Sequence, residues 1–266
     1  METFRKIIPL TFCTGILIML AQLNLFAQTK PKEVNSQGQS WVSINSTNRL
    51  NNKFGLIADL HIRRTNFAAD PNFYFARVAL NYWLKENITV AVGVGQMWLA
   101  PSKAGWHHYA QEHRLYQQVQ ITSKLGKTSL LQRIRNEQRW QEKIVDDKFT
   151  RSYKFTNRAR YLLSITIPVF KNPHYPSLVL SDELLVQFGK EIVYNTFDQN
   201  RAFIGIRQPI SKSLSFDLGY MLVYQQKASG YQYDKNHTFR WFFYYTPDSR
   251  RKGQTKDKKV ITNILS

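Results

Sequence analysis

Charged side chains recur at every second position in several segments of this sequence. Glu and Arg alternate between residues 112 and 114 and again between 133 and 139, and the spacing returns at 158 and 160. Alternate positions of a β-strand share one face. We therefore predict a single charged face, called here the charge ladder. Its predicted members are Glu112, Arg114, Arg133, Arg135, Glu137, Arg139, Arg158, Arg160, Glu183, Arg201 and Arg207.

Two kinds of chemistry are open to the charge ladder. Guanidinium groups bind carboxylates through paired hydrogen bonds, so the ladder could brace neighbouring strands. Arg outnumbers Glu among its members, and rings of Arg in a pore favour anions. The first interpretation is a structural one, and the second predicts selective passage of a small anionic solute.

Histidines offer a third possibility, an enzyme active site at the rim of the fold. A base and its orienting group are what a hydrolase or protease needs, but neither G-x-S-x-G nor H-E-x-x-H occurs. The histidines lack a third ligand at a recognisable spacing, so we predict no metal site. We assign no catalytic residue, and an enzyme is the less favoured interpretation. The residues considered are His107, His108 and His113 with Ser102, and His61 with Asp59.

The elements that would carry these residues are β-strands, because the dominant hydrophobic period is two. In residues 54–63, one face is Phe, Leu, Ala, Leu and Ile, whereas the other includes Asp59, His61 and Arg63. No comparable stretch has helical spacing. The predicted strands span residues 40–48, 53–64, 72–84, 88–100, 108–123, 128–141, 152–168, 177–189, 199–209, 213–226 and 236–246.

Strands of this length favour a transmembrane antiparallel β-barrel over a soluble secreted β-sandwich. Sandwich strands usually have about five or six residues, whereas a tilted membrane strand needs about 9–11. Aromatic residues also gather near the ends of the apolar faces, as in interfacial girdles. The predicted girdle comprises Tyr74, Tyr82, Trp83, Trp98, Trp140, Tyr220, Tyr224, Trp241 and Tyr245.

The count of eleven segments conflicts with the even strand numbers of bacterial single-chain barrels. If the tight links after residues 49, 84, 124 and 209 are periplasmic turns, the first counted strand descends. An ascending strand would then be missing before Trp41, or the first segment would not span the membrane. We predict ten or twelve strands and prefer twelve.

The N-terminus has the order of a secretory signal peptide. Arg5 and Lys6 precede an apolar stretch over residues 7–26, and Ala27 is followed by polar sequence. An uncleaved membrane anchor is the alternative, because the stretch approaches the ~20 residues of a spanning helix. We predict a signal peptide over 1–27, a linker over 28–39, the barrel over 40–247 and a basic tail over 248–266. Cleavage removes Cys13, the single cysteine, and with it any disulfide.

The net charge also bears on the choice of partner. The chain has 37 Lys and Arg against 18 Asp and Glu, a formal charge of +19, which in a cytoplasmic protein would suggest nucleic acid. In a secreted barrel the excess divides among the lumen, the loops and the tail. The expected partners are therefore outer-membrane lipid and a small anion, and no nucleic acid. No phosphate-binding glycine motif occurs, so no cofactor is expected.

The arrangement resembles an uncharacterised family of bacterial outer-membrane proteins, the domain of unknown function 2490. The matching features are an early Trp, an Arg-bearing strand, an R-x-R-x-E-x-R run and a downstream Q-N-R. In this sequence they are Trp41, Arg77, Glu112-His113-Arg114, Gln117-Gln118, residues 133–139, Arg158-Ala159-Arg160, Glu183, Asp198-Gln199-Asn200-Arg201 and Gly205. The resemblance implies a barrel in the bacterial outer membrane and brings no assigned activity. The basic tail departs from it.

Overall fold

A computed structural model describes residues 30–101 and 103–250 of the chain. These residues form eleven strands, and they contain no helix that is long and apolar enough to cross a membrane. The predicted signal peptide lies outside the described residues. The strands are β1 (Glu33–Arg49), β2 (Phe54–Thr65), β3 (Asp70–Lys85), β4 (Ile88–Leu99), β5 (Ala110–Leu125), β6 (Thr128–Val145), β7 (Lys148–Pro168), β8 (Ser177–Phe188), β9 (Phe197–Pro209), β10 (Leu214–Gln226) and β11 (Gln232–Tyr245).

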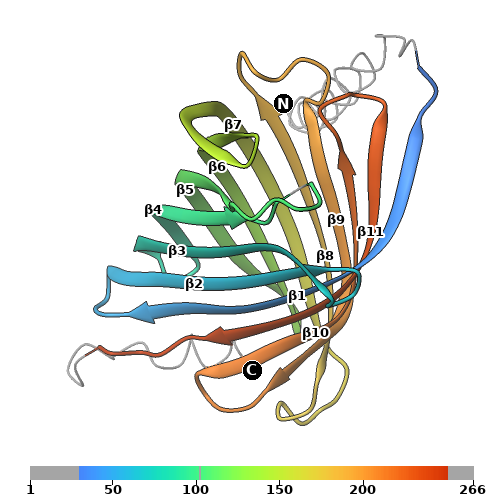
Figure 1. The fold of residues 1–266 in the computed structure, drawn as a ribbon. Coiled ribbons are helices and arrows are strands. Elements are labelled where there is room, and N and C mark those ends of the chain that lie inside the picture. Colours follow the sequence, from blue (N-terminus) through green and yellow to red (C-terminus); the bar gives the residue numbers. More distant parts are fainter. Residues whose placement is uncertain (1–29, 102, 251–266) are drawn as a thin grey trace, which may run out of the picture.

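The strands close into one barrel, in which the first strand pairs with the last. Consecutive strands pair antiparallel, but β1 and β11 are parallel, with Glu33 opposite Gln232 and Trp41 opposite Arg240. Figure 1 shows blue β1 beside red β11 with their arrowheads pointing the same way. All eleven predicted segments are confirmed as strands. The prediction of ten or twelve strands is wrong, because it assumed an antiparallel closing pair, which an odd number cannot make.

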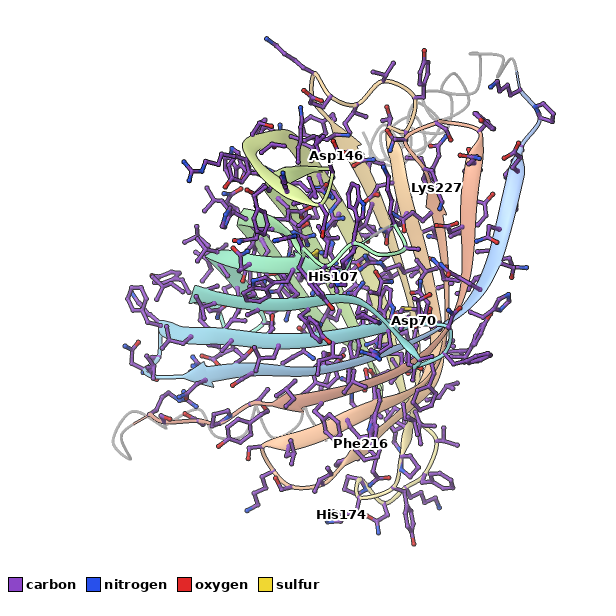
Figure 2. The ribbon with its side chains drawn as sticks, in the orientation of Figure 1. Asp70, His107, Asp146, His174, Phe216 and Lys227 are labelled. Atoms are coloured by element: carbon purple, nitrogen blue, oxygen red, sulfur yellow. The ribbon has the colours of Figure 1, made fainter. Side chains whose placement is uncertain are left out.

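The barrel has two ends, defined here by the connections at each. The first end carries the connections at 50–53, 86–87, 126–127, 169–176 and 210–213, and the second those at 66–69, 100–109, 146–147, 189–196 and 227–231. In Figure 2 His174 lies at the first end, and Asp146 and Lys227 lie at the second. β1 starts at the second end, at Glu33, within the segment 28–39 that the sequence suggested as a linker. The short links predicted from the sequence all lie at the first end. That end also carries one longer connection of eight residues, 169–176.

The outer face of the barrel is largely apolar. Leu60, Val78 and Ile134 are 59%, 57% and 61% exposed in the isolated chain, and they lie on three different strands. Exposed apolar area spread over neighbouring strands marks a surface that is covered in use. The alternation that places these side chains outside directs their neighbours Asp59, Arg77 and Arg135 into the barrel.

One group of amide side chains interrupts the apolar outer face. Gln117 on β5 exchanges hydrogen bonds with Gln138 on β6, at 3.2 and 3.3 Å, and accepts a third from Asn136. Gln117 and Asn136 are directly opposite in the β5–β6 ladder. The amides therefore satisfy one another, which lowers the penalty of placing them on an apolar surface.

Close backbone approach inside the barrel requires glycine at one paired position. Gly205 on β9 lies opposite Gly219 on β10. A Cβ on Gly219 would meet the Gly205 Cα at 2.5 Å, and one on Gly205 would meet the Phe203 Cζ at 2.5 Å. Because glycine has no side chain, the buried Phe203 ring can pack over Gly205 on the inner wall, beside Trp41 and Met221.

The start of the predicted basic tail packs against the first end of the barrel. The Ser249 amide donates to the Arg49 carbonyl at 2.9 Å, and the Arg250 guanidinium donates to Asp248 and Asn52. The hydrogen bonds to Arg250 lower the pKa of the Asp248 carboxyl. Residues 248–250 are therefore an extension of the barrel, and the tail from 251 onward lies outside the described residues.

Candidate functional site

A cavity of about 750 Å3 runs inside the barrel. Its lining includes Glu86, Asn87 and Asp248 near the first end, and Asn72 and Gln225 near the second. Every strand contributes inward side chains to it, because each strand has a length that spans the wall and a period of two. The cavity therefore extends along most of the lumen.

Arginine dominates the charged lining of this cavity. Among the described residues, twelve arginines line it against seven carboxylates. The arginines are Arg49, Arg63, Arg77, Arg114, Arg133, Arg135, Arg139, Arg158, Arg160, Arg201, Arg207 and Arg240. The carboxylates are Asp59, Glu86, Glu112, Glu183, Asp198, Asp217 and Asp248. The lumen thus carries an excess of positive charge even when Glu137, buried behind the lining, is added.

Two carboxylates, Glu137 and Glu183, organise the centre of the network. Glu183 on β8 accepts hydrogen bonds from Arg133 at 2.8 Å, Arg160 at 2.7 Å and Arg201 at 3.2 Å. Arg160 also donates to Glu137 at 2.7 Å. Because these residues come from β6, β7, β8 and β9, the network ties four consecutive strands together along the inner wall.

Arg158 extends this centre toward the second end. It lies directly opposite Glu137 in the β6–β7 ladder and donates to it, and its Nη1 donates to Asp198 at 2.9 Å. Glu112 on β5 pairs with Arg114, two residues along the same strand. Arg158 therefore links β7 to β6 through Glu137 and to β9 through Asp198.

Smaller ion pairs occupy the rest of the wall. Asp59 forms an ion pair with Arg77 on the neighbouring strand. Asp217 forms ion pairs with Arg207 and Arg240, with nitrogen–oxygen distances of 2.7 and 3.4 Å. At the first end, Arg49 donates to both oxygens of Glu86 at 2.6 and 2.7 Å. These hydrogen bonds lower the pKa of the Glu86 carboxyl, which lies in the β3–β4 turn.

Other lumen arginines bond to neutral groups. Arg139 donates to the Thr156 hydroxyl at 3.1 Å and to the Gln187 carbonyl at 2.6 Å. Arg135 donates twice to Gln118, and the nearest oxygen of Glu137 is 3.7 Å from its Nη1. Their charge is therefore not neutralised as fully as that of Arg158 or Arg160.

The structure brings the predicted charge ladder together in this one lumen. Ten of its members line the cavity, and Glu137 is covered by the arginines that it binds. The ladder left out other charged residues that line the same lumen, namely Arg49, Arg63, Arg77, Arg240, Asp59, Asp198 and Asp217. Strand parity was the available signal for most of them, since Asp59 and Arg63 share the face that the sequence already marked as polar.

The predicted aromatic girdle divides between the two faces. Tyr74, Trp98, Trp140 and Tyr220 lie on the outer face and are 36–45% exposed. Tyr82 packs edge-on against Phe54, and Tyr224 stacks on Tyr233 at 5.1 Å. The remaining outer members are Trp241 and Tyr245.

Trp83 is the exception in this set. It points into the lumen, where the Arg49 guanidinium lies 4.8 Å from its ring. Its odd position on β3 puts it on the same face as Arg77, and Gly55 on β2 leaves room for the indole ring. Including Trp83 in an outer girdle was therefore wrong.

The histidines do not form the catalytic arrangements that were considered from the sequence. At the second end, His108 Nδ1 lies 3.1 Å from Asp147, and the backbone amides of His107 and His108 both donate to that carboxylate. The hydrogen bond from the His108 amide is the largest cause of the lowered Asp147 pKa. Asp147 thus fastens the β4–β5 loop, which contains His107 (Figure 2), to the β6–β7 turn.

The other histidines are separated by the barrel wall. His113 lies on the outer face of β5 near Tyr153, whereas His61 lies inside between Phe75 and Phe242. Asp59, considered as the partner of His61, binds Arg77, and Ser102 lies outside the described residues. Within residues 30–101 and 103–250, no group of three His, Cys, Asp or Glu side chains could hold a metal ion.

Comparison with known proteins identifies a family. The model of a protein family of unknown function, DUF2490, matches residues 38–234. The chain belongs to the DUF2490 family. No curated protein and no solved structure matches it. The match begins in β1 and ends in β11, so the DUF2490 region covers nearly the whole barrel.

Proposed function

We propose that this DUF2490 protein is a bacterial outer-membrane barrel whose arginine-rich lumen admits small anions. The observation that carries the proposal is the cavity along the lumen, lined by twelve arginines and seven carboxylates. Rings of Arg attract anions and repel cations. Most of these arginines are also held in fixed positions by carboxylates, which keeps the lumen from being filled by mobile side chains.

The membrane placement is supported by the outer face. A closed barrel leaves no unpaired strand edge, which is the condition for spanning a bilayer with strands. Apolar side chains such as Leu60 and Ile134 would contact lipid, and Trp98 and Trp140 would lie where aromatic residues gather at bilayer interfaces. The partners expected on this basis are outer-membrane lipid and a small anionic solute.

A bracing role is the second candidate function, favoured by the network around Glu137 and Glu183. Eleven strands make a narrower lumen than the 16–18 of open porins. In the bracing role, the ion pairs hold neighbouring strands of the barrel wall together and no solute passes through the lumen.

Planar-bilayer conductance tests the proposal. The purified protein should conduct, with chloride permeating better than potassium. Arg135→Ala should reduce this preference, because Arg135 lines the lumen and its hydrogen bonds go to the neutral Gln118. Arg64→Ala is the matched control, since Arg64 follows the inward Arg63 and bonds to loop carbonyls of Ala68 and Ala69. Conductance no higher than that of empty bilayers would refute anion passage and leave the bracing role. Failure to fractionate with outer membranes would refute the placement.

A further inference from the structure

Among the described arginines of the lumen, Arg63 alone has neither an ion pair nor a hydrogen bond from its guanidinium. It lines the cavity near the second end of β2, and among the described residues no carboxylate lies within ion-pair distance of its guanidinium. Its Nε is buried without a hydrogen-bond partner. A buried cation in this state lacks the compensation that its neighbours have.

Aromatic rings hold the Arg63 side chain in place. Its Cζ lies 3.3 Å from the centre of the Trp41 ring and 4.5 Å from that of Phe73. Trp41 is itself fixed by a 2.8 Å hydrogen bond from its indole nitrogen to Gln39. Cation–π contacts orient a guanidinium, but they do not neutralise its charge.

The groups around Arg63 add positive charge. Its electrostatic neighbours are Arg201, Arg160, Arg114 and the carboxylate Glu183. Glu183 is already bound by Arg133, Arg160 and Arg201. Arg201 also faces the Trp41 ring, at 5.2 Å, so Arg63 and Arg201 flank one indole.

We infer that Arg63, with Arg201 across Trp41, forms a binding site for a small oxyanion in the lumen. The inference rests on the proposed anion pathway, which brings the ligand to the site. An oxyanion offers two or more oxygens to a guanidinium fork, and it would supply the charge that the protein does not supply to Arg63. Inorganic phosphate is a suitable probe because it has this chemistry.

Arg240 provides a matched control for Arg63. Its guanidinium also lies between two rings, 4.1 Å from Phe203 and 4.2 Å from Phe242. Unlike Arg63, it contacts Asp217 and donates to the Tyr244 hydroxyl at 2.8 Å. Arg207 keeps Asp217 paired when Arg240 is replaced. The two positions therefore share an aromatic setting and differ in their anionic partner.

The test is calorimetric titration of phosphate into the full chain in detergent micelles, at constant ionic strength. We expect saturable one-site binding by the wild type and by Arg240→Gln, and at least a tenfold loss of affinity in Arg63→Gln. Arg63→Lys should weaken binding less than Arg63→Gln, since it keeps the charge and loses the fork. Heat-dependent gel migration verifies that each variant is folded.

The outcomes separate this site from the proposed pathway. Absence of saturable binding by the wild type, or equal affinities of wild type and Arg63→Gln, overturns the site. Anion-selective conductance in bilayers alongside either result leaves the pathway standing. Arg63-dependent phosphate binding without conductance supports the site and refutes the pathway.

Discussion

Replacing Glu183 with Gln tests whether the lumen network holds the barrel together. The Glu183 side chain is 8% exposed, and it accepts hydrogen bonds from three arginines on β6, β7 and β9. Gln keeps the shape but loses the charge, and its NH2 group turns a donor toward guanidinium donors. Removing one partner of a buried ion pair costs about 3–5 kcal/mol, because the remaining charge is left uncompensated. We expect the free energy of unfolding to fall by about that amount.

The control is Asp182→Asn, one residue earlier on the same strand. Asp182 lies on the outer face, and within the described residues Asn200 is the side chain that donates hydrogen bonds to it. The free energy of unfolding should therefore change by less than about 1 kcal/mol. The assay is urea unfolding in detergent, followed by tryptophan fluorescence and by heat-dependent gel migration. If Glu183→Gln and Asp182→Asn shift the unfolding midpoint equally, the network does not brace the barrel.

Three other predictions follow from single features of the structure. Arg49 lowers the pKa of Glu86 from 4.5, so the Arg49–Glu86 pair stabilises the fold above pH 4.5, and this contribution is lost as the pH falls through the lowered pKa. The acid-induced drop in the urea unfolding midpoint should therefore be smaller in Glu86→Gln than in wild type. An equal drop in both proteins would contradict a stabilising Arg49–Glu86 pair. Gly219→Val should prevent folding or destabilise by more than about 3 kcal/mol, because its Cβ would meet the Gly205 Cα at 2.5 Å, whereas Gly105→Asn, in an open loop, should fold with normal gel migration. In membranes, a tag placed before Glu33 and a tag placed after Arg250 should lie on opposite sides, so protease added to intact cells should remove one of them; removal of both, or of neither, would argue against the parallel closure.

The face of each strand could be predicted from the sequence because parity depends on spacing alone. On β2, alternation placed Leu60 and Ile62 outside and Asp59 and Arg63 inside, and the structure agrees. The family resemblance is likewise confirmed over residues 38–234.

Ion-pair partners could not be predicted in the same way. Pairing depends on register, and bulges change register locally, as between Leu185 and Val186 where β8 meets β9. The bulge lets Asp198 face Arg158 although Gln199 also points inward. A sequence gives no sign of which side of a bulge a residue will occupy, so Asp198 was left out of the charge ladder.

Arg63 illustrates a different limit. The sequence placed it on the polar face, but nothing in its spacing distinguished it from Arg77, which has Asp59 as a partner. What sets Arg63 apart is the Trp41 ring on β1 and the Phe73 ring on β3, and the absence of a carboxylate within ion-pair distance among the described residues. Contacts of this kind depend on three strands at once.

The odd strand number has a consequence for the two ends of the chain. In an even, fully antiparallel barrel the first and last strands meet in opposite directions, so both chain ends leave from the same end. Here β1 and β11 run in parallel over fourteen paired positions, from Glu33 opposite Gln232 to Ser46 opposite Tyr245. The first strand therefore begins at the end of the barrel opposite to where the last strand finishes. If the proposed membrane placement holds, Glu33 and Tyr245 therefore lie toward opposite sides of the bilayer.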